Sequence, residues 1–164
     1  MKIEKEKVNN IKNNLISFLL KITEDKIKES KLQFTNLKQE ASQAPGAMQS
    51  QHCGLKAEFS RLADSTQDKL NQLQKDFEFL QSYEIKNLDQ QIVREGSLVA
   101  IEDPIKRIYF ILPVCGGEVI KLQDIDEEIT VMTSSTPLGS ELLNKKINSL
   151  LNFRDKDISI IDIY

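Results

Sequence analysis

The sequence predicts an α+β protein in which a long antiparallel coiled-coil hairpin of two helices precedes a small β-rich domain. Apolar residues recur at intervals of three and four in the early part of residues 4–42 and keep a heptad rhythm from Leu70 to Leu80 within residues 55–88, as in coiled coils. A Pro45-Gly46 turn signal separates these two stretches. Three of the four prolines and most β-branched runs lie in the last part of the chain, which divides it into a hairpin, 1–92, and a second domain, 93–164.

The first helix is expected over residues 4–42. At about 1.5 Å per residue, it would form a rod of roughly 57 Å. A rod of this length on a small domain suits reaching or dimerisation. Its narrow apolar seam leaves the other faces to water. The seam consists of Val8, Ile11, Leu15, Phe18, Leu19, Ile22, Ile27, Phe34, Leu37 and Ala41.

The second helix is expected over residues 55–88. The step of eight residues from Leu62 to Leu70 predicts a local change of winding, because the other intervals are shorter. Pro45 disfavours helix at Ala44, so the hairpin tip is placed near residues 43–54. The seam of this helix consists of Phe59, Leu62, Leu70, Leu73, Phe77 and Leu80.

The second domain is predicted to be an antiparallel sheet with one helix. Gly116-Gly117 predicts a hairpin turn, since glycine readily adopts the positive φ angles that such turns need. A helix is expected over residues 137–147, with Thr136 as its N-cap and Pro137 at its first position. Strands are expected over residues 97–102, 107–114, 119–122, 129–133 and 157–164.

Composition narrows the classes of function. The 164 residues carry a net charge of −3, whereas a free-standing nucleic-acid binder usually has a basic surplus. No run of about 18 apolar residues occurs, so neither a membrane-spanning helix nor a membrane partner is expected. Cys53 and Cys115 lie far apart in the sequence, which favours free thiols in a reduced, cytoplasmic protein.

Metal and thiol chemistry are not expected. His52 and Cys53 are adjacent, but a structural zinc site needs about four ligands and Cys115 belongs to the other domain. A nucleophilic cysteine would need a base and an orienting acid. We therefore expect no cofactor, and we interpret this pair as tip residues shaped for a protein groove. The acidic residues within 124–128 lack the spacing of a calcium loop and are interpreted as a solvated turn or an acidic surface.

Three stretches of the second domain share a family pattern: Gly-Ser-Leu-Val at 96–99, Tyr-Phe-Ile at 109–111 followed by Gly116-Gly117, and Thr-Pro-Leu-Gly-Ser-Glu-Leu-Leu-Asn-Lys-Lys at 136–146. In this pattern and order of elements the chain resembles the GreA/GreB transcription elongation factors. The family has Ser-Pro-Leu-Gly, two variable residues, a leucine pair and Gly-Lys in the last stretch. This chain departs from it at Thr136, at Asn144, and at Asn148-Ser149, where Gly-Asp is usual.

The resemblance implies an FKBP-like second domain that docks on bacterial RNA polymerase while the hairpin enters the secondary channel. It implies a monomer that contacts DNA or RNA only within the transcription complex. Helix capping and a tight turn would also account for residues 136–139 without any partner. The residues implied in docking are Ser134, Ser135, Thr136, Pro137, Leu138 and Gly139.

The expected hairpin tip departs from the family's cleavage chemistry. Cleavage-stimulating members resemble Gly-Asp-Leu-x-Glu-Asn-Ala-Glu-Tyr at the tip, where carboxylates help to hold a second Mg²⁺. Here Ala-Glu-Phe at 57–59 matches the end of that pattern, but no acid occurs between Glu40 and Glu58. We therefore expect weak or absent cleavage stimulation and no enzyme activity. The residues expected to face the polymerase active centre are Met48, Gln49, His52, Cys53 and Glu58, although Met48 and Gln49 would equally suit solvent.

Three alternatives stay open at this point. The chain could be an active cleavage factor that uses Glu58 or polymerase-supplied ligands. It could be an interaction protein unrelated to polymerase that dimerises through its coiled coil. A prolyl isomerase, the activity found among FKBP-like folds, is disfavoured because such sites are lined by aromatic residues. The second domain offers only Tyr109, Phe110, Phe153 and Tyr164, and no tryptophan.

Overall fold

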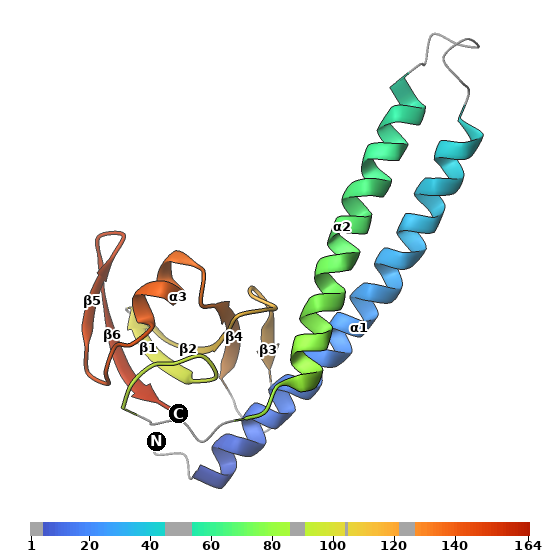
Figure 1. The fold of residues 1–164 in the computed structure, drawn as a ribbon. Coiled ribbons are helices and arrows are strands. Elements are labelled where there is room, and N and C mark those ends of the chain that lie inside the picture. Colours follow the sequence, from blue (N-terminus) through green and yellow to red (C-terminus); the bar gives the residue numbers. More distant parts are fainter. Residues whose placement is uncertain (1–4, 45–53, 86–90, 104, 122–126) are drawn as a thin grey trace. The chain divides into compact units, whose positions relative to one another are not determined.

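The computed structural model describes residues 5–44, 54–85, 91–103, 105–121 and 127–164. These residues form a helical hairpin and a six-stranded sheet with one short helix, which confirms the predicted α+β class (Figure 1). In chain order the elements are α1 (Lys5–Gln43), α2 (Gly54–Ser82), β1 (Leu98–Asp103), β2 (Ile105–Leu112), β3 (Val119–Lys121), β4 (Glu128–Thr133), α3 (Pro137–Leu142), β5 (Leu150–Phe153) and β6 (Lys156–Ile163).

Packing divides the chain into two compact units. One is Phe18–Ser82, and the other combines Met1–Ser17 with Tyr83–Tyr164. Helix α1 runs through the boundary at Ser17 without a break. The domain boundary predicted between residues 92 and 93 stays a prediction.

The buried positions of α1 follow a longer repeat than the sequence indicated. Val8, Leu19, Ser30 and Ala41 are all buried and are spaced eleven residues apart. An eleven-residue repeat corresponds to about 3.67 residues per turn, close to that of a straight α-helix. The predicted seam was wrong at Phe18, whose side chain is 41% exposed, because small polar side chains occupy part of the buried stripe.

The buried positions of α2 keep a heptad spacing. Ala63, Thr66 and Leu70 are buried, whereas Leu62 is 47% exposed. The predicted change of winding after Leu62 was therefore wrong, since the seam passes through Ala63 and Thr66 instead. The Thr66 hydroxyl donates to the Leu62 carbonyl oxygen at 2.7 Å, so its polar group is satisfied within the helix.

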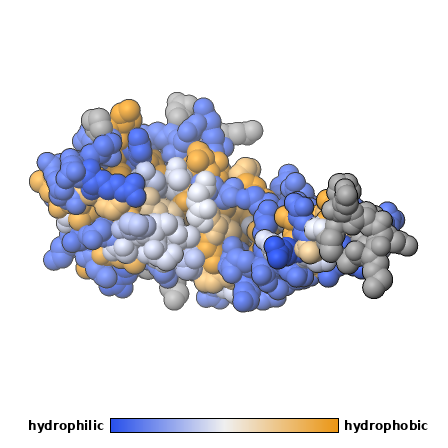
Figure 2. All heavy atoms as spheres, turned by 90° about the horizontal axis from the view of Figure 1, so that it is seen from above, coloured by the Kyte–Doolittle hydropathy of each residue, from blue (hydrophilic) through white to orange (hydrophobic). Residues whose placement is uncertain are grey.

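Small side chains run through the middle of the hairpin unit. Thr23 and Ser30 of α1 and Ala63 and Thr66 of α2 are all buried in a unit built from these two helices. Short side chains at a helix contact permit a small distance between the two axes. On the face seen in Figure 2, hydrophilic residues cover most of the described surface, and apolar residues show in smaller areas. The hairpin unit is thus a slim rod with a narrow buried seam.

The sheet has the strand order β3-β4-β2-β1-β6-β5. All neighbouring strands are antiparallel except β2 and β4, which are parallel, with Leu112 opposite Thr133. The predicted all-antiparallel sheet was wrong for this pair. The turn at Gly116-Gly117 exists, but Gly117 N donates to Val131 O of β4 at 2.8 Å rather than to β2. A turn signal fixes where the chain reverses, and it leaves open which strand becomes the partner.

Both faces of the sheet are buried. One face packs with α3 in a core that includes Val99, Ile111, Leu142 and Ile158. The other face is also buried and carries Leu98, Ala100, Ile108, Phe110, Leu112, Ile129 and Val131. Burial on both faces explains the continuous apolar runs at 98–101 and 108–112, which do not alternate with polar residues.

Several bounds differ from the predictions. Helix α2 ends at Ser82 rather than residue 88, and β2 spans Ile105–Leu112 rather than residues 107–114. Helix α3 ends at Leu142 rather than residue 147, since Leu143 is extended and Asn144 has a φ of 63°. Strand β5 was not predicted at all. It is four residues long and pairs with β6 across a tight turn at Arg154 and Asp155.

A seam-register test follows from the exposed Leu62 and its buried neighbour. Ala63→Leu should lower the free energy of unfolding by about 1–3 kcal/mol, because the added side chain overfills a closed seam. Leu62→Ala should change it by less than about 0.5 kcal/mol. Urea unfolding followed by the helical circular dichroism signal measures both. Equal effects at the two positions would contradict this seam.

Lys12 of α1 is a buried cation, 3% exposed. Burial lowers its pKa to about 8, from an ordinary value of 10.5. Between these two values the unfolded chain holds the Lys12 proton and the folded chain does not. This group therefore makes the free energy of unfolding rise with pH across that interval.

Lys12→Met should abolish this rise and increase the free energy of unfolding at pH 7 by up to about 3 kcal/mol. The control is Lys21→Met, at an exposed position of the same helix. Urea unfolding at several values of pH from 7 to 10.5 compares the variants. A Lys12→Met curve parallel to that of the unmodified chain would contradict the assignment.

Candidate docking groove and hairpin end

The loop before α3 is held by one threonine. Thr136 is the N-cap, with extended backbone, and its hydroxyl accepts from Gly139 N at 3.1 Å. The same hydroxyl donates to the Thr133 carbonyl oxygen at 2.8 Å. Pro137 follows in the first turn of the helix, where a missing N–H has no cost. The predicted cap and first helical position are confirmed.

Gly139 is required by the close approach of this loop. A Cβ at position 139 would overlap the Thr133 carbonyl oxygen and lie 2.8 Å from the Thr136 hydroxyl oxygen. The obstacle at Thr133 is backbone and cannot move aside like a flexible side chain. The Thr-Pro-Leu-Gly sequence therefore has a structural basis of its own.

Two departures from the family pattern occur where the backbone is left-handed. Asn144 has a φ of 63° and Asn148 a φ of 64°. Glycine adopts this region freely, and asparagine is among the few other residues that tolerate it. The backbone N–H groups of both residues donate to backbone oxygens, that of Asn144 to Val93 O at 2.9 Å and that of Asn148 to Ile160 O at 2.8 Å. The substitutions thus keep the backbone path that glycine would allow.

A groove of about 570 Å³ lies beside this loop. Its walls come from the turn after β2, from β4, from the start of α3 and from the turn between β5 and β6. The apolar side chains in it belong to Val131, Met132, Pro137, Leu138 and Phe153. The remaining lining residues are Gly116, Gly117, Thr130, Thr133, Thr136 and Arg154.

The six residues expected to dock separate into two groups. Thr136, Pro137 and Leu138 line the groove. The other three do not line it. The Ser134 hydroxyl donates to Glu95 Oε1 at 2.6 Å, Ser135 is exposed and Gly139 is buried. The role of all six residues in docking stays a prediction.

Phe153 and Arg154 were missed as candidate site residues. Their strand was not predicted, and their place in the groove depends on the β5–β6 turn. The Arg154 guanidinium carbon lies 5.4 Å from the centre of the Phe153 ring. The only sequence signal was the polar stretch Arg-Asp-Lys-Asp at 154–157 after an apolar run, which is typical of a turn.

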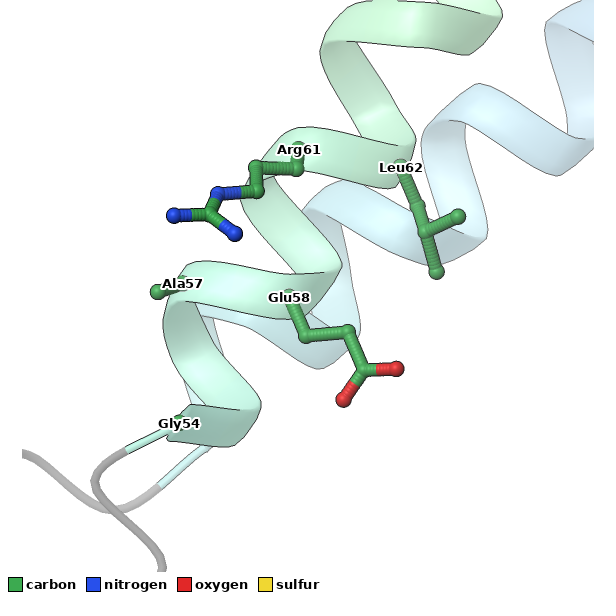
Figure 3. A pocket seen from close by; sticks show the side chains of 5 residues that line it. All are labelled: Gly54, Ala57, Glu58, Arg61 and Leu62. Carbon is green, nitrogen blue, oxygen red and sulfur yellow. The ribbon is translucent and has the colours of Figure 1, made fainter.

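Glu58 is the one predicted tip residue within the part of the chain that the structure describes. It is exposed in the second turn of α2 and lines a shallow hollow of about 560 Å³ (Figure 3). Gly54, Ala57, Arg61 and Leu62 line the same hollow, and the Glu58 and Arg61 side chains point in different directions. Met48, Gln49, His52 and Cys53 lie outside the described residues.

Among the described residues, no group of three or more His, Cys, Asp or Glu side chains comes together. Within the same residues, no helix is long and apolar enough to cross a membrane. Cys115 is half-buried, has a φ of 58° and lies next to the Gly116-Gly117 turn, and it forms no disulfide with any residue that the structure describes.

Comparison with known proteins gives structural matches only. No protein-family model and no curated protein sequence matches the chain. The GreA factor homolog 1 (Gfh1) of Thermus thermophilus is 10% identical, with a TM-score of 0.37 over 88% of this chain and 94% of that one. A second structure of the transcription factor Gfh1 is 13% identical, with a TM-score of 0.36 over 91% and 92%.

The glycine at the start of α3 can be tested by adding one methyl group. Gly139→Ala should lower the free energy of unfolding by about 2 kcal/mol or more, because the new Cβ meets the Thr133 carbonyl. Gly54→Ala, at a position with open space around it, should leave stability unchanged or raise it by up to about 1 kcal/mol. Thermal unfolding followed by calorimetry measures both. A Gly139→Ala protein as stable as the unmodified chain would show that the loop can relax.

Proposed function

We propose that the chain is a Gre-like factor that binds bacterial RNA polymerase through its second domain and inserts its hairpin into the secondary channel. The observation that carries this proposal is the combination of a slim helical hairpin with an N-capped Thr-Pro-Leu-Gly loop beside an apolar groove. Neither part alone is specific. Together they provide a reaching element and a docking element in one chain.

The hairpin has dimensions that suit insertion. Helix α2 has 29 residues, and at about 1.5 Å per residue it is roughly 44 Å long. The small buried residues of its seam favour a narrow cross-section, as a channel requires. A positioning function of this kind needs no cofactor and no catalytic group, so we propose that the chain is not itself an enzyme. Polymerase as the partner would place it in the cytoplasm.

The scarcity of acidic residues near the hairpin end argues against cleavage stimulation. Mg²⁺ prefers several oxygen ligands, and phosphodiester cleavage benefits from a second metal ion. Glu58 is a single exposed carboxylate, and no other acid occurs in the sequence from position 41 to 57. We propose that the protein acts by occupying the channel, and that it modulates elongation, pausing or initiation without shortening the transcript.

The test uses bacterial core RNA polymerase that carries a backtracked, end-labelled RNA. The full chain should co-elute with this complex in gel filtration, and the rate of RNA shortening should stay within about two-fold of polymerase alone, because one carboxylate recruits Mg²⁺ poorly. Glu58→Gln should leave both results unchanged.

Other outcomes separate the alternatives. Rapid shortening that Glu58→Gln abolishes would establish an active cleavage factor. Lack of co-elution at low salt would refute polymerase binding. A mass that doubles with concentration in light scattering would instead favour a protein that dimerises through its coiled coil.

A further inference from the structure

The described lining of the groove in the second domain combines apolar side chains with one cation. Met132, Leu138 and Phe153 supply apolar surface, and among the described lining residues only Arg154 carries a charge. A groove of this composition differs from a nucleic-acid surface, which neutralises several phosphates with several cations. Its chemistry fits a protein segment that offers an apolar side chain beside an acidic one.

Arg154 occupies an unfavourable backbone conformation. Its φ is 52°, and the next residue, Asp155, has a φ of 60°. A turn with two such residues favours asparagine or glycine, and a long side chain there is uncommon. Residues kept in sparsely populated conformations often serve a function that the relaxed residue could not. Turn geometry alone therefore does not explain an arginine at this position.

The Arg154 side chain has no acidic partner among the residues that the structure describes. Its guanidinium carbon lies 5.4 Å from the centre of the Phe153 ring, a cation–π contact that favours a position beside the groove. Among the described residues, no carboxylate lies within ion-pair distance of it. By contrast, the neighbouring Lys156 lies 3.9 Å from Asp103. The Arg154 guanidinium thus keeps its hydrogen-bond donors available for a carboxylate from outside.

We infer that this groove recognises an acidic, apolar segment of the polymerase surface, with an apolar side chain against Met132, Leu138 and Phe153 and a carboxylate on Arg154. The inference rests on the proposed function and adds the chemistry of the partner segment. The planar guanidinium can form two parallel hydrogen bonds with a carboxylate, which also sets the direction in which the segment lies. Arg154 acts here as a specificity determinant, next to the predicted docking residues Thr136, Pro137 and Leu138.

Arg154→Asn separates recognition from folding. Asparagine suits the left-handed turn, so the variant should keep its thermal stability, but it lacks the cation. Arg107→Asn is the matched control, because Arg107 is exposed near the opposite end of β2 from the groove. Arg154→Lys keeps the charge without the planar fork.

The measurement is a fluorescence anisotropy titration of the labelled full-length chain with nucleic-acid-free core RNA polymerase at several salt concentrations. Arg154→Asn should weaken binding about ten-fold, as expected for loss of one charge-assisted pair, and should flatten the salt dependence. Arg154→Lys should lie between this variant and the unmodified chain. Arg107→Asn should bind within about two-fold of the unmodified chain.

Two results would overturn the inference, and they differ from each other. If the unmodified chain binds and Arg154→Asn binds equally well with the same salt dependence, Arg154 does not bind a carboxylate of the partner. The proposed function would then still stand. If the unmodified chain does not bind polymerase at any salt concentration, both the proposed function and the identity of the partner are refuted.

Discussion

The parallel pairing of β2 and β4 is the constraint on which the candidate site depends. Parallel strands end at the same edge of a sheet, and Leu112 at the end of β2 lies opposite Thr133 at the end of β4. The turn after β2 and the loop after β4 therefore leave the sheet side by side. Gly116 shows how close they are, since a Cβ there would lie 2.7 Å from the Thr133 side chain. With an antiparallel pair the two loops would lie at opposite edges and no groove would form between them.

The same contact explains the order of residues at the start of α3. The Thr133 carbonyl oxygen accepts from both the amide and the hydroxyl of Thr136, at 3.1 Å and 2.8 Å. These two hydrogen bonds turn the chain sharply enough for the helix to begin four residues after the strand ends. The tightness of that turn leaves no room for a side chain at Gly139. The loop composition thus follows from the place where β4 is inserted in the sheet.

The sequence predicted elements that local chemistry determines. The two long helices, the Thr136 cap and the reversal at Gly116-Gly117 all rest on residues close together in the chain. What it missed depends on distant partners: the insertion of β4 between β2 and β3, the short strand β5, and the groove to which Phe153 and Arg154 contribute. In the hairpin, apolar character alone pointed to Leu62. The structure buries Ala63 and Thr66 instead, because a close helix contact selects for size as well as polarity.

The departures from the Gre pattern fall into two kinds with different physical meaning. Asn144 and Asn148 replace glycines at left-handed positions, and asparagine meets the same backbone requirement, so the fold is unaffected. The hairpin end has no such equivalence, because no other side chain offers the hard, charged oxygens of a carboxylate to Mg²⁺. The chain thus keeps the backbone conformations of the second domain and lacks the carboxylate ligands near the hairpin end. In the function proposed above, the second domain would therefore supply the affinity and the hairpin would act through its shape.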